Sequence, residues 1–290
     1  MSSFPPEVVN IDVGDAALGV VRWHTRPGAP VVFAVHDFSG NAWSWAAVAR
    51  HLEGRAALVA VDLRGRGFSH HIDGPFGVRQ HADDVAAIIR RLNASPAVIA
   101  GHGLGAFVAL AAAERHPADV RDVVLVDGGS PIPAPDGGDP EERLRELLGP
   151  ALGRLGRVWT DRVAYRSRWT EHPAFADMMN PEVERYALSD LVECDGGFRS
   201  RVSETGVRTD GVELLVDTEL RTMLERRRRT RIVVAETGLD NGPPPLVDDD
   251  VVARLEQHRW RRVPATNHYS ILLGEAGAAT VADELVACLG

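Results

Sequence analysis

Short apolar runs alternate with longer amphipathic stretches along the first half of the chain. The runs are five or six residues long and rich in β-branched side chains, which is typical of strands buried on both faces. The predicted strands are residues 31–36, 57–62, 97–101 and 123–127, and the predicted helices between them are residues 42–52, 78–92 and 104–116. An alternating hairpin at residues 8–13 and 18–23 precedes them. This order predicts an α/β fold with a doubly wound, mostly parallel sheet.

The pattern changes near residue 130, where prolines and glycines gather before a long arginine-rich helical region. Strand patterns return at residues 231–235 and 259–263, and helical patterns follow them at residues 248–257 and 275–289. A helical region that interrupts a strand–helix alternation predicts a cap over the sheet. We therefore expect a core of residues 1–130 and 230–290, with a helical cap of residues 131–229 inserted between core strands 6 and 7.

Composition removes several classes of function. The chain of 290 residues has a formal net charge of −9, which argues against a nucleic-acid partner. It contains no lysine, since all 32 Lys+Arg residues are arginine, and this excludes Schiff-base chemistry and a P-loop lysine. No apolar run approaches the roughly 18–20 residues of a membrane helix, and the pattern of the first residues leads us to expect no signal peptide. With only Cys194 and Cys288, the chain is expected to be cytoplasmic, while its oligomeric state is left open.

Polar motifs stand where the predicted strands end, at the edge where α/β sheets place their ligands. The motifs are Gly101-His102-Gly103-Leu104-Gly105, His36-Asp37-Phe38-Ser39-Gly40, the segment Asp62–Ser69 (DLRGRGFS) and Asn267-His268-Tyr269. The first is a G-x-x-x-G turn between a strand and a helix. They resemble, respectively, the nucleophile elbow, the oxyanion-hole loop, the D-x-R-G-x-G-x-S segment and the catalytic histidine of the α/β-hydrolase fold family, in which the elbow precedes the catalytic acid and the acid precedes the histidine.

That resemblance implies a role for each matching position. Gly103 stands where the family most often has a nucleophilic serine, so the nucleophile position is vacated. His268 matches the catalytic histidine. Asp240, just after the strand at 231–235, is expected to be its acid partner, and Asp127 is the alternative. The oxyanion hole would be formed by the backbone N–H groups of Phe38 and Leu104.

Two departures from the family pattern shape the functional prediction. Glycine at position 103 removes both the nucleophile and the strain that a side chain suffers at a sharp elbow. Asp37 stands where the family usually has glycine. Its carboxylate is expected to oppose the negative charge that an oxyanion hole stabilises.

The pocket between sheet and cap is expected to be largely apolar, with few polar anchors, and to bind a small molecule. The candidate substrate contacts are His36, Asp37, His102, Trp43 and Tyr269. No dinucleotide fingerprint, P-loop lysine or histidine–cysteine cluster is present, so neither a cofactor nor a metal is expected.

Three functions are consistent with these residues. The favoured one is a non-hydrolytic enzyme in which His268 and Asp240 form an acid–base dyad for lyase, cyclisation or carbon–carbon bond-forming chemistry on a natural-product-like substrate. The second is an inactive or slow hydrolase that has lost its serine. The third is a small-molecule binding protein that retains the pocket without turnover.

Overall fold

A computed structural model describes residues 5–131, 138–175, 178–227, 230–247, 249–253 and 257–290. Its main sheet has eight strands in the order β1-β2-β4-β3-β5-β6-β9-β10. Their bounds are β1 Glu7–Asp12, β2 Ala17–Trp23, β3 Val31–Val35, β4 Ala57–Val61, β5 Ala97–His102, β6 Val120–Val126, β9 Arg231–Ala235 and β10 Arg259–Val263. The β1–β2 and β2–β4 pairs are antiparallel and all others are parallel. The predicted α/β class with a doubly wound, mostly parallel sheet is confirmed.

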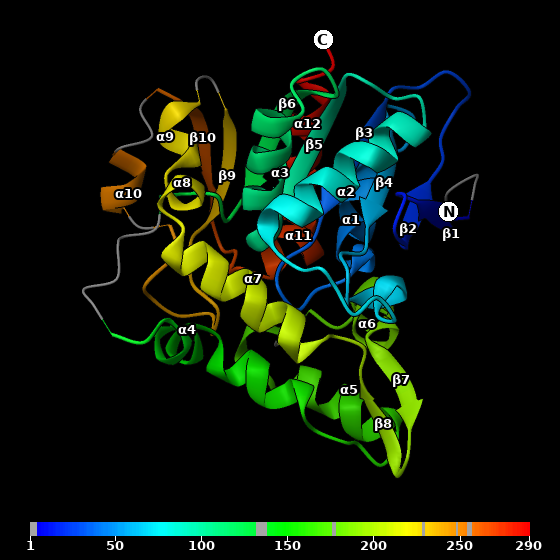
Figure 1. Ribbon diagram of the computed structural model, residues 1–290, viewed down its shortest axis with the longest axis vertical. Helices are drawn as coiled ribbons and strands as arrows, with labels where there is room; N and C mark the ends of the chain where they lie inside the picture. Colours follow the sequence, from blue (N-terminus) through cyan, green and yellow to red (C-terminus); the bar gives the residue numbers. More distant parts are fainter. Residues whose placement is uncertain (1–4, 132–137, 176–177, 228–229, 248, 254–256) are drawn as a thin grey trace.

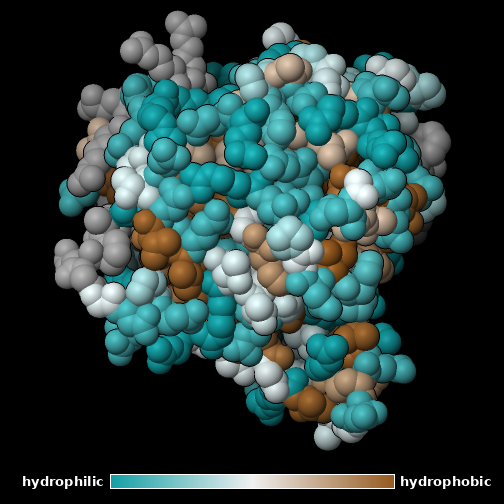
Figure 2. Space-filling model, viewed as in Figure 1, coloured by the Kyte–Doolittle hydropathy of each residue, from teal (hydrophilic) through white to brown (hydrophobic). Residues whose placement is uncertain are grey.

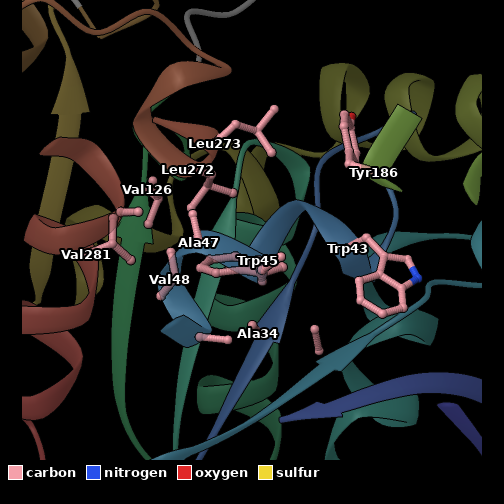
Figure 3. Packing of buried hydrophobic residues seen from close by; sticks show 14 of the residues in the cluster. Ala34, Trp43, Trp45, Ala47, Val48, Val126, Tyr186, Leu272, Leu273 and Val281 are labelled. Carbon is pink, nitrogen blue, oxygen red and sulfur yellow. The ribbon is translucent and has the colours of Figure 1, made fainter. Parts of the chain in front are cut away.

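Helices cover both faces of this sheet (Figure 1). On one face lie α1 (Ala46–Leu52), α11 (Ser270–Leu273) and α12 (Glu275–Val286), and on the other lie α2 (Val78–Arg91) and α3 (Leu104–Arg115). Successive residues of β3 alternate between the two cores: Val32 and Ala34 pack on the first face, Phe33 and Val35 on the second. Figure 3 shows the first core around Trp45 and Val48. Burial of both faces explains the uninterrupted apolar runs in the sequence.

Among the described residues of the segment between β6 and β9, which we call the cap segment, the regular elements are helices and one hairpin. Its elements are α4 Pro140–Leu155, α5 Arg162–Glu171, α6 Pro181–Ser189, β7 Leu191–Cys194, β8 Gly197–Ser200, α7 Glu204–Val216, α8 Thr218–Arg221 and α9 Met223–Arg226. Within the described residues, β7 and β8 pair with each other and not with the main sheet. The hairpin is absent from the sequence expectation, although Asp195-Gly196 is a dipeptide typical of tight hairpin turns. Part of the predicted linker, residues 132–137, lies outside the described residues.

The part of the cap segment from α4 to β8 lies at one end of the sheet, at the bottom of Figure 1. From there α7 leads to α8 and α9, which lie higher in the view, and α9 contacts α3 of the core. Asp210 of α7 is fully buried and accepts hydrogen bonds from Arg66 Nη2 at 2.5 Å and from the Gly77 backbone N–H at 2.7 Å. His81 Nε2 lies 3.1 Å from the same carboxylate. Removing a partner from such a buried pair costs about 3–5 kcal/mol, so the middle of α7 is firmly held against the core.

The face drawn in Figure 2 is mainly hydrophilic, and its hydrophobic side chains are exposed in separate small groups. One group lies at the protruding tip that the β7–β8 hairpin forms at lower right. Among the described residues, no helix combines the length and apolar character needed to cross a membrane. The last elements follow the predicted pattern: α10 is Asp249–Ala253, and residues 248 and 254–256 of that predicted helix lie outside the described residues.

Candidate active site

The turn between β5 and α3 has the geometry of a sharp elbow. Gly103 adopts φ +52° and ψ −116°, in the half of conformational space that side chains disfavour. The helix packs so closely on β3 that a Cβ atom at Gly105 would lie 2.2 Å from the Val35 carbonyl oxygen. Gly103 lines a cavity of about 680 Å³.

The volume that a side chain at Gly103 would need is filled by Asp37. A Cβ atom built on Gly103 would lie 2.0 Å from Asp37 Oδ1. That oxygen accepts a hydrogen bond of 2.7 Å from the backbone N–H of Leu104, one of the two expected oxyanion donors. The carboxylate therefore does not merely oppose the oxyanion hole, as the sequence suggested. It accepts the hydrogen bond of the Leu104 N–H and so blocks one of the two expected oxyanion donors.

The second expected donor, the Phe38 N–H, has no described contact that tests it, so its role stays a prediction. The Phe38 carbonyl accepts a hydrogen bond of 3.1 Å from Arg66 Nε, which anchors this loop to the segment after β4.

His268 lies between two carboxylates. Its Nδ1 is 2.7 Å from Asp127 Oδ2, and its Nε2 is 3.4 Å from Asp37 Oδ2. The histidine and Asp127 are almost completely buried, whereas the Asp37 side chain retains 22% of its exposure. The three groups form a continuous relay, Asp127–His268–Asp37, at the carboxyl edge of the sheet.

The expected pairing of His268 with Asp240 is wrong. The Asp240 side chain is 74% exposed, and its carboxylate lies 3.7 Å from His172 Nε2. Asp127 is the acid partner of His268 because it directly follows β6 and therefore lies beside the loop that carries His268. It sits in the left-handed region at φ +43°, and its Oδ1 accepts a hydrogen bond of 3.0 Å from the Ala235 N–H, which fixes the carboxylate before it reaches the imidazole.

The charges of this relay follow from its contacts. Burial alone would lower the pKa of His268, but hydrogen bonds and attraction from Asp127 and Asp37 outweigh it and raise the pKa to about 10. Burial likewise opposes ionisation of Asp37, yet the contact with His268 and the Leu104 N–H hold its pKa far below the ordinary range. At neutral pH the resting pair is therefore an imidazolium beside a carboxylate.

Two of the five candidate substrate contacts turn out to be structural. His36 is fully buried: its Nδ1 donates to the Asp37 carbonyl at 2.7 Å, and its Nε2 accepts from the Leu63 N–H at 3.1 Å. Burial lowers its pKa to about 3, so it is a neutral brace for the loop. Trp43 packs in the core, with Trp23 5.5 Å away edge-on and Arg185 over its ring (Figure 3 shows its position). Neither residue lines the cavities described below.

The other candidates lie at the site. His102 stacks on His268 with ring centroids 4.2 Å apart, and its Nε2 donates to the His268 carbonyl at 2.9 Å. Burial and the nearby His268 charge lower its pKa to about 4, so it is neutral at pH 7. Tyr269 packs edge-on against His268 and lines two hollows next to Asp37.

Three hollows meet at Asp37, which alone among the described residues lines all of them. The largest, about 680 Å³, is the apolar cavity, walled by leucine, valine and phenylalanine side chains of α3, α4 and α7 and of the loop after β9. The second, about 250 Å³, is the arginine cavity, which contains Arg154 and Arg168. The third is a small hollow of about 20 Å³.

The sequence reasoning missed the side chains that the cap segment contributes. Arg154 is buried in an ion pair with Asp190, and Trp169 and Tyr186 join it at the wall of the arginine cavity. In the sequence they are visible only as cationic and aromatic residues within amphipathic helices. That pattern does not distinguish a packing role from a binding role. Among the described residues, no group of three or more His, Cys, Asp or Glu side chains is arranged to hold a metal ion.

Comparison with known proteins agrees with this architecture. A family model described as the alpha/beta hydrolase fold matches residues 30–275. The 2-(acetamidomethylene)succinate hydrolase of Mesorhizobium japonicum is 32% identical over 236 residues, which cover 78% of this chain and 79% of that protein.

Solved structures show the same fold. A crystal structure of E-2-(acetamidomethylene)succinate hydrolase superposes with a TM-score of 0.79 at 22% identity, covering 98% of this chain and all of that one. The thioesterase domain from the curacin biosynthetic pathway gives a TM-score of 0.73 at 19% identity, with the same coverage. From the sheet order, the elbow and these matches, the chain belongs to the α/β-hydrolase fold family.

Proposed function

We propose that this protein is a small-molecule hydrolase in which Asp37 replaces the missing serine as the nucleophile. The observation that carries the proposal is the position of its carboxylate, within the volume of the absent side chain at Gly103 and on the Leu104 N–H. Asp37 Oδ2 is not held by that amide and faces His268. A carboxylate kept ionised at neutral pH is a competent nucleophile toward carbon.

The same geometry favours a saturated electrophilic carbon over an acyl carbon. Acyl transfer places negative charge on the substrate oxygen, which needs the oxyanion donors. Asp37 Oδ1 already holds the Leu104 N–H. Attack by Oδ2 on an alkyl halide creates no oxyanion on the substrate. Attack on an epoxide places negative charge on the ring oxygen, which the His268 imidazolium beside Oδ2 can protonate, so neither reaction depends on the Leu104 N–H in its first step.

The two steps balance in atoms and charge. In the first, Asp37 Oδ2 forms a bond to carbon as the carbon–leaving-group bond breaks. The alkoxide of an opened epoxide takes the proton of the His268 imidazolium, whereas a halide leaves as the anion and that proton passes to solvent once the ester has removed the charge of Asp37. In the second, water adds to the Asp37 carboxyl carbon and gives a proton to His268, while the charge that develops on Oδ1 is stabilised by the Leu104 N–H. Loss of the product alcohol restores the carboxylate.

The cavities support a substrate with an apolar body and an acidic group. The apolar cavity fits the body, and the guanidinium groups of Arg154 and Arg168 in the arginine cavity suit a carboxylate. The relative from Mesorhizobium japonicum acts, by its name, on a succinate derivative. In this proposal residues 131–229 serve as the lid of the pocket.

A second candidate is the non-hydrolytic acid–base reaction, with the roles revised. Because His268 is protonated at rest, it is an acid, and Asp37 is the adjacent base. An adjacent acid and base suit an elimination or isomerisation, and this ion pair is the observation that favours it. The hydrogen bond from Leu104 lowers the basicity of Asp37, which is why we place this reaction second.

Trapping the covalent intermediate tests the proposal. His268→Gln enzyme is incubated with a panel of styrene oxide, 1-bromohexane and 6-bromohexanoate, and digested for mass spectrometry. We expect an ester on the peptide that contains Asp37, because the variant lacks the base for the second step. Asp37→Asn is the matched control and should stay unmodified. Absence of the ester with every compound, with elimination products formed by the wild type instead, would favour the second candidate.

A further inference from the structure

The small hollow of about 20 Å³ lies on a different side of Asp37 from the apolar cavity. Its polar wall includes Asp37, Ser44, His102, Tyr186 and Tyr269, and its apolar wall includes Leu272 and Leu273. Asp37 is the one residue that it shares with the apolar cavity. Figure 3 shows where Tyr186, Leu272 and Leu273 meet the core around Trp43 and Trp45. A volume of about 10–15 Å³ is enough for one water molecule, so the hollow has room for one.

Ser44 marks this hollow as a polar site. It lies in the short 3₁₀ helix Ala42–Trp45, whose other three side chains are hydrophobic and buried. Ser44 itself is 5% exposed, and its Oγ has no hydrogen-bond partner within the described part of the chain. A buried hydroxyl without a partner destabilises a fold, and such groups are commonly satisfied by an ordered water.

The neighbouring groups complete the set of partners that a water needs. His102 uses Nε2 as the donor to the His268 carbonyl, so in the neutral ring Nδ1 is left as an acceptor. The Asp37 carboxylate, in the same wall, is a further acceptor. Buried waters typically make about three hydrogen bonds, and Ser44, His102 and Asp37 together meet that number.

We propose that this hollow binds the water that hydrolyses the Asp37 ester. The inference rests on the proposed function, since it concerns the second step of that reaction. With the alkyl group in the apolar cavity, water in the small hollow can reach the Asp37 carboxyl carbon without crossing the substrate. Its oxygen bonds to that carbon, and its proton goes to His268 Nε2, which lies outside the hollow but 3.4 Å from Oδ2 of the same carboxyl group. His268 has released its own proton in the first step. The ester C–O bond then breaks and the alcohol departs.

Variants at Ser44 separate the two steps. Ser44→Ala removes the hydroxyl and leaves the space, whereas Ser44→Val also fills the hollow. Ester formation and ester hydrolysis are measured by rapid quench and mass spectrometry, with whichever of the three panel compounds esterifies Asp37 in the His268→Gln enzyme. We expect hydrolysis to slow about 10-fold in Ser44→Ala and about 10²-fold in Ser44→Val, in proportion to the lost partner and the lost space. Ester formation should change less than about threefold in both variants.

Thr230→Val is the matched control, because Thr230 Oγ1 is also buried without a described partner but lies just before β9, outside the residues that line the three hollows. Both of its steps should match the wild type. If the ester forms and Ser44→Ala and Ser44→Val hydrolyse it at the wild-type rate, the water site is overturned while Asp37 remains the nucleophile. If no variant, including His268→Gln, ever carries the ester, the proposed function fails and the water site with it.

Discussion

Two turns at the carboxyl edge of the sheet differ in opposite directions from the family pattern. The turn after β5 has glycine at position 103, where a side chain is expected, and the loop after β3 has Asp37, where glycine is expected. One turn has lost a nucleophile and the other has gained a carboxylate. Because a Cβ atom at Gly103 would lie 2.0 Å from Asp37 Oδ1, the two changes are sterically complementary. The comparison teaches that a side chain from one loop can fill the space that another loop has left empty, and under the proposed function that side chain is the nucleophile.

Placing the residue typical of the family at each of the two positions tests this complementarity most severely. Gly103→Ser alone should lose about 2–5 kcal/mol of stability, because the new side chain meets Asp37 at a positive φ. Asp37→Gly combined with Gly103→Ser should recover at least about 1 kcal/mol relative to the sum of the single changes. Only the double variant should hydrolyse p-nitrophenyl acetate, on the order of 10³-fold faster than Gly103→Ser. Denaturant unfolding and an absorbance assay measure these effects.

Adding His268→Gln to the double variant is the control, and it should abolish the new esterase activity. A Gly103→Ser variant as stable as the wild type, and as active on the ester as the double variant, would show that Asp37 does not fill the nucleophile position.

The two candidate acids provide a second contrast between regions. Asp127→Asn removes the buried partner of His268, and we expect hydrolysis of the ester formed on Asp37 to slow by about 10²-fold or more. Asp240→Asn changes an exposed side chain and should alter the rate less than about twofold. The rate of ester loss in a single-turnover experiment decides between them. Equal losses in both variants would contradict the assignment of Asp127.

The pH dependence of stability gives the most gradual effect, since it is spread over several pH units. His268 keeps its proton in the folded state up to about pH 10, while in the unfolded chain its pKa is the ordinary 6.5. The folded state thus holds one more proton between these values, so the stability from this group is complete below pH 6.5 and is lost as pH rises toward 10. The slope is at most about 1.4 kcal/mol per pH unit. Asp37→Asn should shift this loss to lower pH, since one of the two carboxylates that raise the pKa is gone. Urea unfolding across pH 6–10 measures it, and a wild type whose stability falls no more steeply than that of His268→Gln would refute the ion pair.

The sequence predicted the sheet and the edge that holds the site, because buried strands and strand-end motifs leave local patterns. It could not choose Asp127 over Asp240, since both follow strands, and the choice depends on which strand lies beside the His268 loop. It also treated Gly103 and Asp37 as separate departures, because 66 positions of chain separate them and only the fold brings them into contact. His36 was misjudged for a similar reason: both of its partners are backbone groups, which no residue pattern reveals.

The fate of oxygen in a single turnover tests the central claim most directly. Wild-type enzyme in excess over styrene oxide, or over the panel compound that it esterifies best, reacts in H₂¹⁸O, and both the product and the peptide containing Asp37 are analysed by mass spectrometry. If Asp37 is the nucleophile, the first product carries unlabelled oxygen from its carboxylate, and the heavy isotope appears in Asp37. Heavy oxygen in the first product, with an unlabelled Asp37 peptide, would show that water attacks the substrate directly and would contradict the account.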